Sequence, residues 1–229
     1  MRRLHLLFFL VILNYSYSQE YYSFNGTTYN EAGFKIFLKK EEKVRTKFKA
    51  HFIPNQIKKI NDSLIKYGKI YFLPKEHKLD KIYNKLLKPL PKFELERQNG
   101  GFYISDSLIG KPTIINLWFT NCPPCIEEIP ILNELKQKYG NTINTIAITF
   151  QDRSKVMLFN QLYKFDFEIL INAEKFIDSL GINGYPKIIL LDKNNVIRQI
   201  PFGIYARDAN SSTFLLKEFT THIENLLKE

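Results

Sequence analysis

Two cysteines separated by two prolines are the residues of this sequence whose type and spacing could carry redox chemistry. They stand as Cys122-Pro123-Pro124-Cys125, directly after an apolar run over residues 112–121, and the 229 residues contain no other cysteine. Two sulfurs at this spacing, between a strand-like and a helix-like segment, are typical of a dithiol that forms and breaks a disulfide. The pair is the predicted catalytic centre.

The two sulfurs have different predicted roles. A helix that begins at Cys122 leaves free backbone N–H groups around the first sulfur and places the positive end of the helix dipole there, which favours the thiolate. We therefore predict that Cys122 is the attacking nucleophile. Cys125 lies one helical turn further on, where it can resolve a mixed disulfide. Pro123 suits the first turn of a helix, because its missing N–H has no partner to lose there.

Two other interpretations of the cysteine pair are a purely structural disulfide and a zinc site, and the sequence disfavours both. A purely structural disulfide would close a loop of only two intervening residues, which constrains the unfolded chain very little. A structural zinc site needs four ligands, whereas the sequence has no second cysteine pair and its four histidines show no ligand spacing around the motif. The residue types and their spacing predict neither a metal nor a cofactor.

The N-terminus predicts export. Arg2 and Arg3 precede the apolar stretch Leu4–Leu13, and Ser16-Tyr17-Ser18 follows it, which is the order of a secretory signal peptide over residues 1–18. The apolar stretch is much shorter than the roughly 20 residues that span a bilayer. We therefore expect an exported, periplasmic protein, with an uncleaved signal that retains it at the membrane as the alternative.

Positive charge is concentrated before the redox motif. Residues 19–92 hold 17 Lys/Arg and 7 Asp/Glu, whereas residues 93–229 hold 14 Lys/Arg and 16 Asp/Glu. The basic region is either a solvated lysine-rich surface or a contact site for an anionic membrane or an acidic partner. No nucleic-acid-binding module is recognisable, so nucleic acid is not an expected partner.

The basic region has weak structural patterns. Residues 33–50 alternate in a partly strand-like way, 56–67 have helical spacing, and 79–87 predict a short helix. The prolines of residues 88–92 then favour a linker. We predict a basic N-terminal extension over residues 19–88, of unknown role, and a second domain over residues 89–229.

The second domain has a regular pattern. The Asn99-Gly100 pair between two strand-like runs is a strong hairpin signal. The strands that follow alternate with helices, which predicts an α/β fold with a mixed central sheet flanked by helices. The predicted strands cover residues 93–97, 101–105, 113–119, 142–150, 167–171, 187–192 and 196–201, and the helices cover 124–139, 154–163, 173–180 and 212–228.

This order of elements resembles the thioredoxin fold, and more narrowly the TlpA/ResA-type thiol-disulfide oxidoreductases of the redoxin superfamily. The resemblance covers about residues 89–229, and the motifs carry it together by their order and spacing. They are Leu90–Leu95, Lys111–Trp118, Cys122–Cys125, Glu128–Pro130 and Gly184–Pro186.

The resemblance assigns roles to further residues. Trp118 corresponds to the tryptophan beneath the active site, and Asn116 replaces the buried aspartate of thioredoxins proper. Glu128 is the carboxylate expected to take the proton of Cys125, if burial raises its pKa. The alternative is an ordinary glutamate stabilised by the helix dipole.

Pro186 corresponds to the proline that is cis in this fold and faces the dithiol. The backbone of Tyr185 would then pair with an extended segment of a substrate. With Trp118, these two residues are the predicted substrate-binding set. A plain turn into the following strand is the alternative.

The resulting hypothesis is an exported enzyme that uses its dithiol to reduce or exchange disulfides in protein substrates. The resemblance implies cytochrome c maturation or envelope redox homeostasis as its task, and a membrane dithiol as its electron donor. One alternative is a thiol peroxidase, although Phe119 stands where such enzymes want a threonine. Another is a non-catalytic exported module that binds through residues 19–88.

Overall fold

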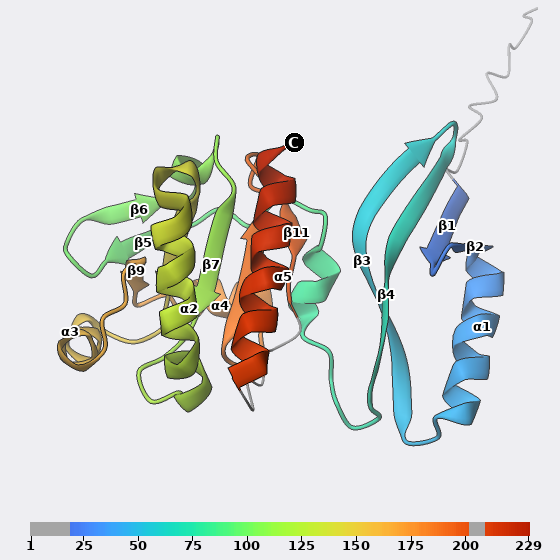
Figure 1. Cartoon of the computed structure of the whole chain (residues 1–229), viewed down its shortest axis with the longest axis horizontal. Helices are drawn as coiled ribbons and strands as arrows, with labels where there is room; N and C mark the ends of the chain where they lie inside the picture. The colour runs from blue at the N-terminus through green and yellow to red at the C-terminus, as the bar shows by residue number, and fades with distance from the viewer. Residues whose placement is uncertain (1–18, 202–208) are drawn as a thin grey trace, which may run out of the picture.

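The computed structural model describes residues 19–201 and 209–229, which form a larger and a smaller lobe (Figure 1). The larger lobe holds the chain from β5 to α5, and the smaller lobe holds β1 to β4. The predicted signal peptide, residues 1–18, lies outside the described residues.

A seven-stranded mixed sheet forms the centre of the larger lobe, in the order β11-β10-β7-β8-β9-β5-β6. Strands β7, β8 and β9 are parallel, and the remaining neighbours are antiparallel. Every strand predicted after residue 92 is present, which confirms the expected fold class. The strands are β5 (Glu94–Arg97), β6 (Phe102–Ile104), β7 (Thr113–Leu117), β8 (Asn144–Ile148), β9 (Glu168–Ile171), β10 (Lys187–Leu191) and β11 (Ile197–Gln199).

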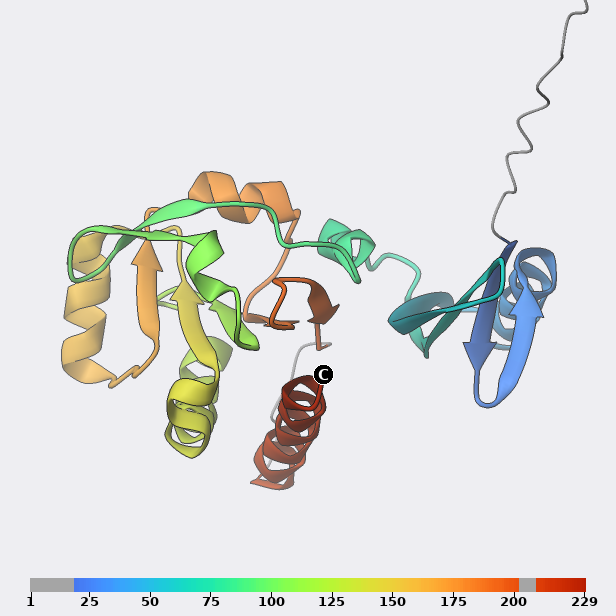
Figure 2. The same cartoon turned by 90° about the horizontal axis from the view of Figure 1, so that it is seen from above.

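Helices cover both faces of this sheet, as Figure 2 shows with α2 and α5 on one side and α4 on the other. The four predicted helices are all present. They are α2 (Pro123–Tyr139), α3 (Arg153–Leu162), α4 (Glu174–Leu180) and α5 (Ala209–Leu227). Short 3-10 turns add η1 (Lys81–Lys85), η2 (Ser105–Leu108) and η3 (Gly140–Thr142).

The alternation of side chains along the strands divides the apolar core in two. On β7, Ile114 joins the core beneath α2, which also contains both cysteines. Its neighbours Ile115 and Leu117 face the other way, into the core beneath α4. The central strand is therefore buried on both faces, as its continuous apolar run predicts.

The smaller lobe is a four-stranded sheet in the order β2-β1-β4-β3, packed against one helix. An aromatic cluster joins the two layers, in which the rings of Tyr22 and Phe34 stack at 4.7 Å between centroids. The elements are β1 (Gln19–Phe24), β2 (Thr27–Asn30), α1 (Glu31–Val44), β3 (Phe48–Ile60) and β4 (Ser63–Pro74).

Two expectations for this lobe were wrong. Residues 33–50 have a strand-like pattern, but they are helical up to Val44. The side chain of Asn30 caps this helix by accepting a hydrogen bond from the Gly33 N–H at 2.8 Å, which favours the helix. The predicted helix over residues 56–67 is a hairpin of β3 and β4. Its turn residue Asn61 has a φ of 53°, a left-handed conformation that asparagine tolerates.

The segment that joins the lobes packs into the larger one. In η1, Ile82 is fully buried and Tyr83 is 6% exposed, and both belong to the core beneath α4. A short helix was predicted here, over residues 79–87. The domain boundary between residues 88 and 89 stays a prediction. The C-terminal end of the predicted extension, which includes η1, packs against the core of the larger lobe.

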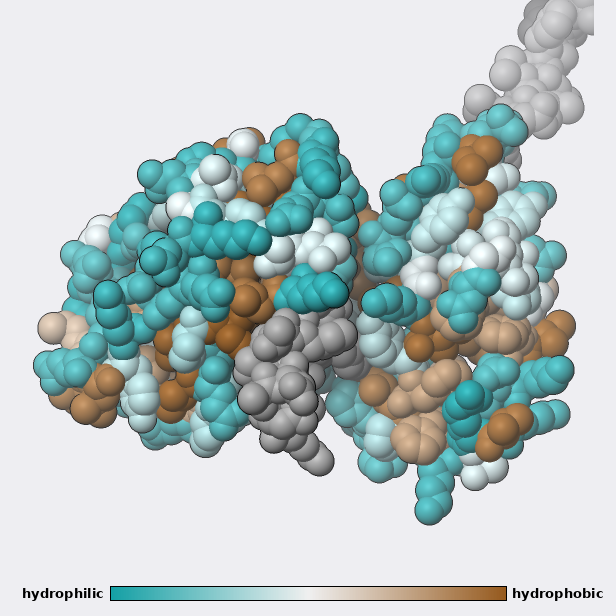
Figure 3. Space-filling view, viewed as in Figure 1, coloured by the Kyte–Doolittle hydropathy of each residue, from teal (hydrophilic) through white to brown (hydrophobic). Residues whose placement is uncertain are grey.

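The surface seen in Figure 3 is mostly hydrophilic on the larger lobe, with apolar patches also visible on the smaller lobe. Exposed apolar side chains of the smaller lobe include Ile36, Val44 and Phe48. Within residues 19–201 and 209–229, no helix has the length and apolar character needed to cross a membrane.

Candidate active site

The dithiol lies where the loop after β7 enters α2, at the carboxyl edge of the parallel strands. Cys122 is the N-cap of α2, and its sulfur accepts a hydrogen bond from the Cys125 N–H at 3.3 Å. Pro123 occupies the first turn of the helix, as predicted. The two sulfurs form a disulfide, with 5.2 Å between the Cα atoms. Cys122 and Cys125 are 3% and 2% exposed, so the oxidised pair sits at the margin of the core.

Aromatic side chains support this loop from below. Trp118 is fully buried, and its ring centroid lies 4.8 Å from that of Phe159 and 5.5 Å from that of Phe165. Trp118 was predicted from the sequence to belong to the substrate-binding set. Because its side chain has no exposed surface, the structure gives it a packing position beneath the dithiol rather than a contact surface.

Glu128 is a buried carboxyl one turn after Cys125 on the same face of α2. Its side chain is enclosed, since the residue is 6% exposed, and it accepts one long hydrogen bond of 3.4 Å from the Asn116 Nδ2. Burial raises the pKa of Glu128 to about 8, and the Asn116 hydrogen bond opposes this shift. The neighbouring Glu127 is exposed.

The Tyr185-Pro186 peptide bond is cis, which confirms the isomer that the resemblance implied. Strand β10 starts one residue later, where Lys187 pairs with Leu117 at the end of β7. Pro186 therefore lies at the same edge of the sheet as the loop that leads to Cys122. The Tyr185 ring contacts those of Phe119 and Phe150, at 5.4 and 6.0 Å between centroids.

Gln151 is a site residue that the sequence analysis did not single out. It follows β8, and its side-chain oxygen accepts the Thr120 N–H at 2.7 Å while its amide donates to the Thr120 Oγ1 at 3.0 Å. These bonds fix the loop just before Cys122. Its position directly after a buried parallel strand could have identified it, because the carboxyl ends of neighbouring parallel strands meet at the same edge of the sheet, where Cys122 also lies.

A groove opens beside the dithiol between α2 and α3, with a volume of about 610 Å³. Its walls are mainly apolar and include the exposed side chains of Leu158 and Leu162. It is lined by Thr120, Asn121, Pro123, Ile126, Gln151, Lys155, Leu158, Phe159, Leu162 and Tyr163. A substrate segment bound to Cys122 would have this groove next to it.

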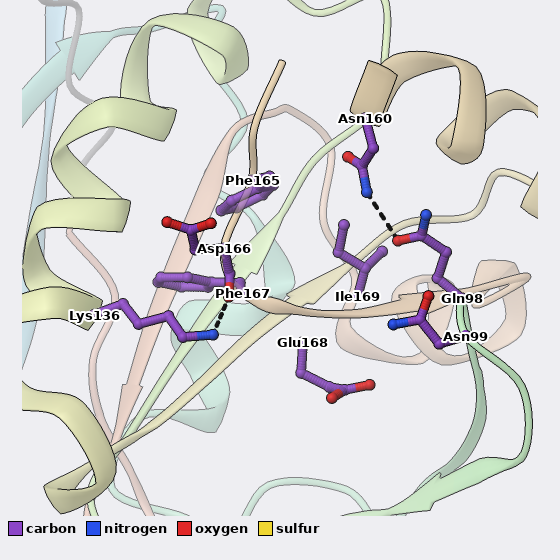
Figure 4. Close-up of a pocket in the computed structure, with 9 residues that line it drawn as sticks. All are labelled: Gln98, Asn99, Lys136, Asn160, Phe165, Asp166, Phe167, Glu168 and Ile169. Carbon is purple, nitrogen blue, oxygen red and sulfur yellow. Dashed lines mark hydrogen bonds between the residues drawn. The ribbon is translucent and has the colours of Figure 1, made fainter. Parts of the chain in front are cut away.

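A second, polar pocket of about 340 Å³ lies away from the sulfurs (Figure 4). The Asn160 amide donates to the Gln98 Oε1 at 2.9 Å across it, and the Lys136 ammonium donates to the Asp166 carbonyl. Neither cysteine lines this pocket. Among the residues that the structure describes, no group of three His, Cys, Asp or Glu side chains is arranged to hold a metal ion.

Comparison with known proteins places this geometry in a family. The model of the AhpC/TSA family matches residues 86–200, about half of the chain. The chain belongs to the AhpC/TSA family. The match begins in the segment that packs into the larger lobe and includes the dithiol, Glu128 and the cis-proline.

Among curated proteins, this AhpC/TSA-family chain is similar to the thiol-disulfide oxidoreductase ResA of Bacillus anthracis, with 30% identity over 125 residues, 53% of this chain and 72% of that protein. It is 34% identical over 122 residues to the thiol:disulfide interchange protein DsbE of Escherichia coli (strain K12), covering 48% of this chain and 62% of DsbE. The match therefore spans less than two thirds of DsbE.

A solved structure supports the fold of this family member. A thiol:disulfide interchange protein of the thioredoxin family from Chlorobium tepidum aligns with a TM-score of 0.51 and 21% identity, over 61% of this chain and 95% of that one. The predicted class, a thiol-disulfide oxidoreductase of thioredoxin-like fold, is thus confirmed. The roles of the individual residues rest on the geometry above.

Proposed function

We propose that this protein reduces or exchanges disulfides of exported protein substrates through Cys122 and Cys125. The observation that carries the proposal is the disulfide at the N-terminus of α2, with the first sulfur as the helix N-cap. A helix N-terminus stabilises a thiolate, because the backbone N–H groups and the helix dipole favour negative charge there. The similarity to ResA and DsbE supports the same chemistry.

Reduction proceeds by two exchanges. The Cys122 thiolate of the reduced enzyme attacks one sulfur of a substrate disulfide, forms a mixed disulfide and releases the other substrate sulfur as a thiolate. The Cys125 thiolate then attacks the Cys122 sulfur, which forms the enzyme disulfide and releases the second substrate thiolate. The substrate gains two electrons and the enzyme loses two.

Glu128 is the proposed proton carrier for Cys125. A pKa of about 8 lies close to that of an ordinary thiol, about 8.5, so a proton moves between the two groups at little cost. Because the carboxyl is protonated in the oxidised protein at neutral pH, it holds the proton that Cys125 takes up when the disulfide is opened. In the reduction of a substrate, the same proton moves from Cys125 to Glu128.

Partners and location follow from the proposal. The enzyme disulfide must be reduced again, and a membrane dithiol protein is the proposed donor. Export through the segment 1–18 would bring the enzyme to substrates with oxidised cysteines, among which apocytochromes c are the family's example. The backbone of Tyr185, before the cis-proline, is the proposed site at which an extended substrate segment pairs.

The smaller lobe is proposed to contact an anionic membrane surface peripherally. Exposed lysines of α1, of the turn after it and of the start of β3 are close in sequence to the exposed apolar residues Val44 and Phe48. This combination favours the boundary between lipid headgroups and water. These lysines, termed the basic face, are Lys39, Lys40, Lys43, Lys47 and Lys49.

The test uses one variant for each sulfur. Cys122→Ser removes the nucleophile, so reduction of insulin disulfides should fall to the uncatalysed rate. Cys125→Ser leaves the attack intact but blocks resolution, so it should accumulate mixed disulfides with protein substrates. A coupled assay of insulin turnover measures the effect of Cys122→Ser. Capture from an exported fraction, followed by non-reducing gels, measures the effect of Cys125→Ser.

Two outcomes would contradict the proposal. If Cys122→Ser retains cellular function while deletion of residues 19–88 abolishes it, the protein acts as a binding module. If the wild type consumes hydrogen peroxide rapidly and leaves protein disulfides intact, it is a thiol peroxidase. Phe119 argues against the peroxidase, because its ring packs against Tyr185 and supplies no hydroxyl three residues before Cys122.

A further inference from the structure

A buried ion pair ties the N-terminal extension to the strand that follows the cis-proline. The Asp80 Oδ2 lies 2.7 Å from the Lys187 Nζ, and the two side chains are 9% and 12% exposed. Lys187 is the residue directly after Pro186. A side chain of the extension therefore reaches the base of the proposed substrate-binding loop, although the two residues are far apart in the sequence.

Further contacts hold the loop itself, residues Gly181–Pro186, which is here called the proline loop. The Asp80 Oδ1 accepts the Asn183 N–H at 3.2 Å, and the Lys81 N–H donates to the Gly181 carbonyl at 2.9 Å. Gly181 has a φ of +70°, and a Cβ on it would lie 2.6 Å from the Lys81 Cβ. The two backbones thus approach as closely as a glycine allows.

The segment that carries Asp80 is itself anchored. The next turn, η1, buries Ile82 and Tyr83 in the core beneath α4, and Leu86, directly after the turn, is buried in the same core. The Lys187 Nζ also lies 5.8 Å from the centre of the Tyr83 ring. Asp80 therefore projects from a fixed base, and it holds both Asn183 within the proline loop and Lys187 at its end.

We propose that Asp80 is a positioning residue for substrate binding, which fixes the proline loop and with it the backbone of Tyr185 and Pro186. This inference rests on the proposed function, since it assumes that the loop pairs with a substrate segment. Asp80 makes no contact with the dithiol in the described structure. Its loss should therefore weaken substrate binding and leave the sulfur chemistry intact.

The test compares Asp80→Ala with Asp192→Ala. Asp192 is a matched control, because it lies just after the other end of β10, is similarly buried and pairs with Arg198 at 3.1 Å. We expect Asp80→Ala to raise the KM for insulin at least fivefold with kcat within twofold. Reduction of 5,5′-dithiobis(2-nitrobenzoate), a small disulfide that needs only Cys122, should stay within twofold of the wild type.

An unchanged KM in Asp80→Ala, or an equal rise in Asp192→Ala, would overturn the proposal. If Asp80→Ala does not fold, the double variant Asp80→Asn with Lys187→Met replaces it, because removal of both charges leaves no unpaired charge in the interior. This variant should still raise the KM at least threefold. A KM like that of the wild type overturns the proposal here as well.

A second measurement separates this inference from the proposed function. Amide hydrogen exchange at Asn183 in the oxidised protein should be at least tenfold faster in Asp80→Ala than in the wild type and Asp192→Ala. Unchanged exchange shows that Asp80 does not fix the loop. Absence of insulin reduction by the wild type would instead refute the proposed function, whatever the exchange rates are.

Discussion

At the scale of single residues, Glu128 makes the pH dependence of stability testable. Its pKa is raised from 4.5 to about 8 in the folded protein, so the folded state keeps a proton that the unfolded state loses. The stabilising effect of this proton is complete below pH 4.5 and is lost as the pH rises to about 8. Since one pKa unit corresponds to about 1.4 kcal/mol, the free energy of unfolding should fall by several kcal/mol over this window.

Glu128→Gln should remove this part of the pH dependence. Urea unfolding of the oxidised protein at pH 5, 7 and 9 measures it, and the same variant should slow insulin reduction by about a hundredfold, because the proton acceptor for Cys125 is lost. Glu127→Gln, at the exposed neighbouring position, is the control and should change neither quantity. Identical unfolding curves for Glu128→Gln and the wild type at each pH would refute a raised pKa.

Two kinds of signal predicted the site residues: local spacing marked those of α2, and the family resemblance supplied Tyr185 and Pro186. Cys122, Cys125 and Glu128 lie within two helical turns, so their spacing alone places them on one side of α2. Gln151 and Asp80 act through contacts with Thr120 and Lys187, which only the fold brings near. Gln151 had only its position after a buried parallel strand as a signal, and nothing local marks Asp80, since a lone carboxylate in a polar segment is usually solvated.

At the scale of elements, the β3–β4 hairpin depends on a close approach at Gly68. A Cβ on this residue would lie 2.4 Å from the Ile53 carbonyl oxygen and 2.6 Å from the Phe52 ring. Gly68→Ala should therefore lower the free energy of unfolding by about 1–3 kcal/mol, the usual cost of overpacking. Urea denaturation followed by circular dichroism measures this loss.

The matched control for Gly68→Ala is Lys69→Ala on the same strand, because Lys69 is exposed and should be replaced with little effect. Cys122 reactivity toward a small disulfide should stay within twofold in both variants, since the dithiol lies in the other lobe. Equal stability of the two variants would show that the hairpin relaxes around the added methyl group.

The same hairpin shows where prediction of elements fails. Residues 56–67 have apolar side chains at helical spacing, but Ile57 and Ile60 are 40% and 46% exposed and form no buried helical stripe. Strand pairing decided the structure, because residues 56–60 pair with 63–67 across the turn at Asn61, and 63–67 also pair with β1. Such pairing overrides local preference. The elements of the larger lobe were predicted correctly because their apolar runs are continuous and buried, as in β7, whose five residues are all buried.

At the scale of the whole molecule, charge and redox chemistry belong to different lobes. The basic face should bind the chain to vesicles of phosphatidylserine and phosphatidylcholine, and less so at high salt. Replacing Lys43, Lys47 and Lys49 by glutamine should weaken binding about a hundredfold, at about 1 kcal/mol per lysine. Vesicle sedimentation of residues 19–229, the chain without the predicted signal peptide, measures the partition.

The control for this variant removes the same charge from the larger lobe, through glutamine at Lys111, Lys175 and Lys228, which are all exposed. It should bind vesicles much as the wild type does. An equal loss in both variants would mean that net charge, and not the basic face, governs the attraction.

The burial of Trp118 has one more consequence. The chain contains a single tryptophan, and it lies in the same core cluster as both sulfurs. Indole emission therefore originates from one position only, beside a bond whose opening changes the electronic surroundings of the ring. The molecule carries a built-in optical reporter, with which its redox midpoint can be followed in solution without a dye or an added label.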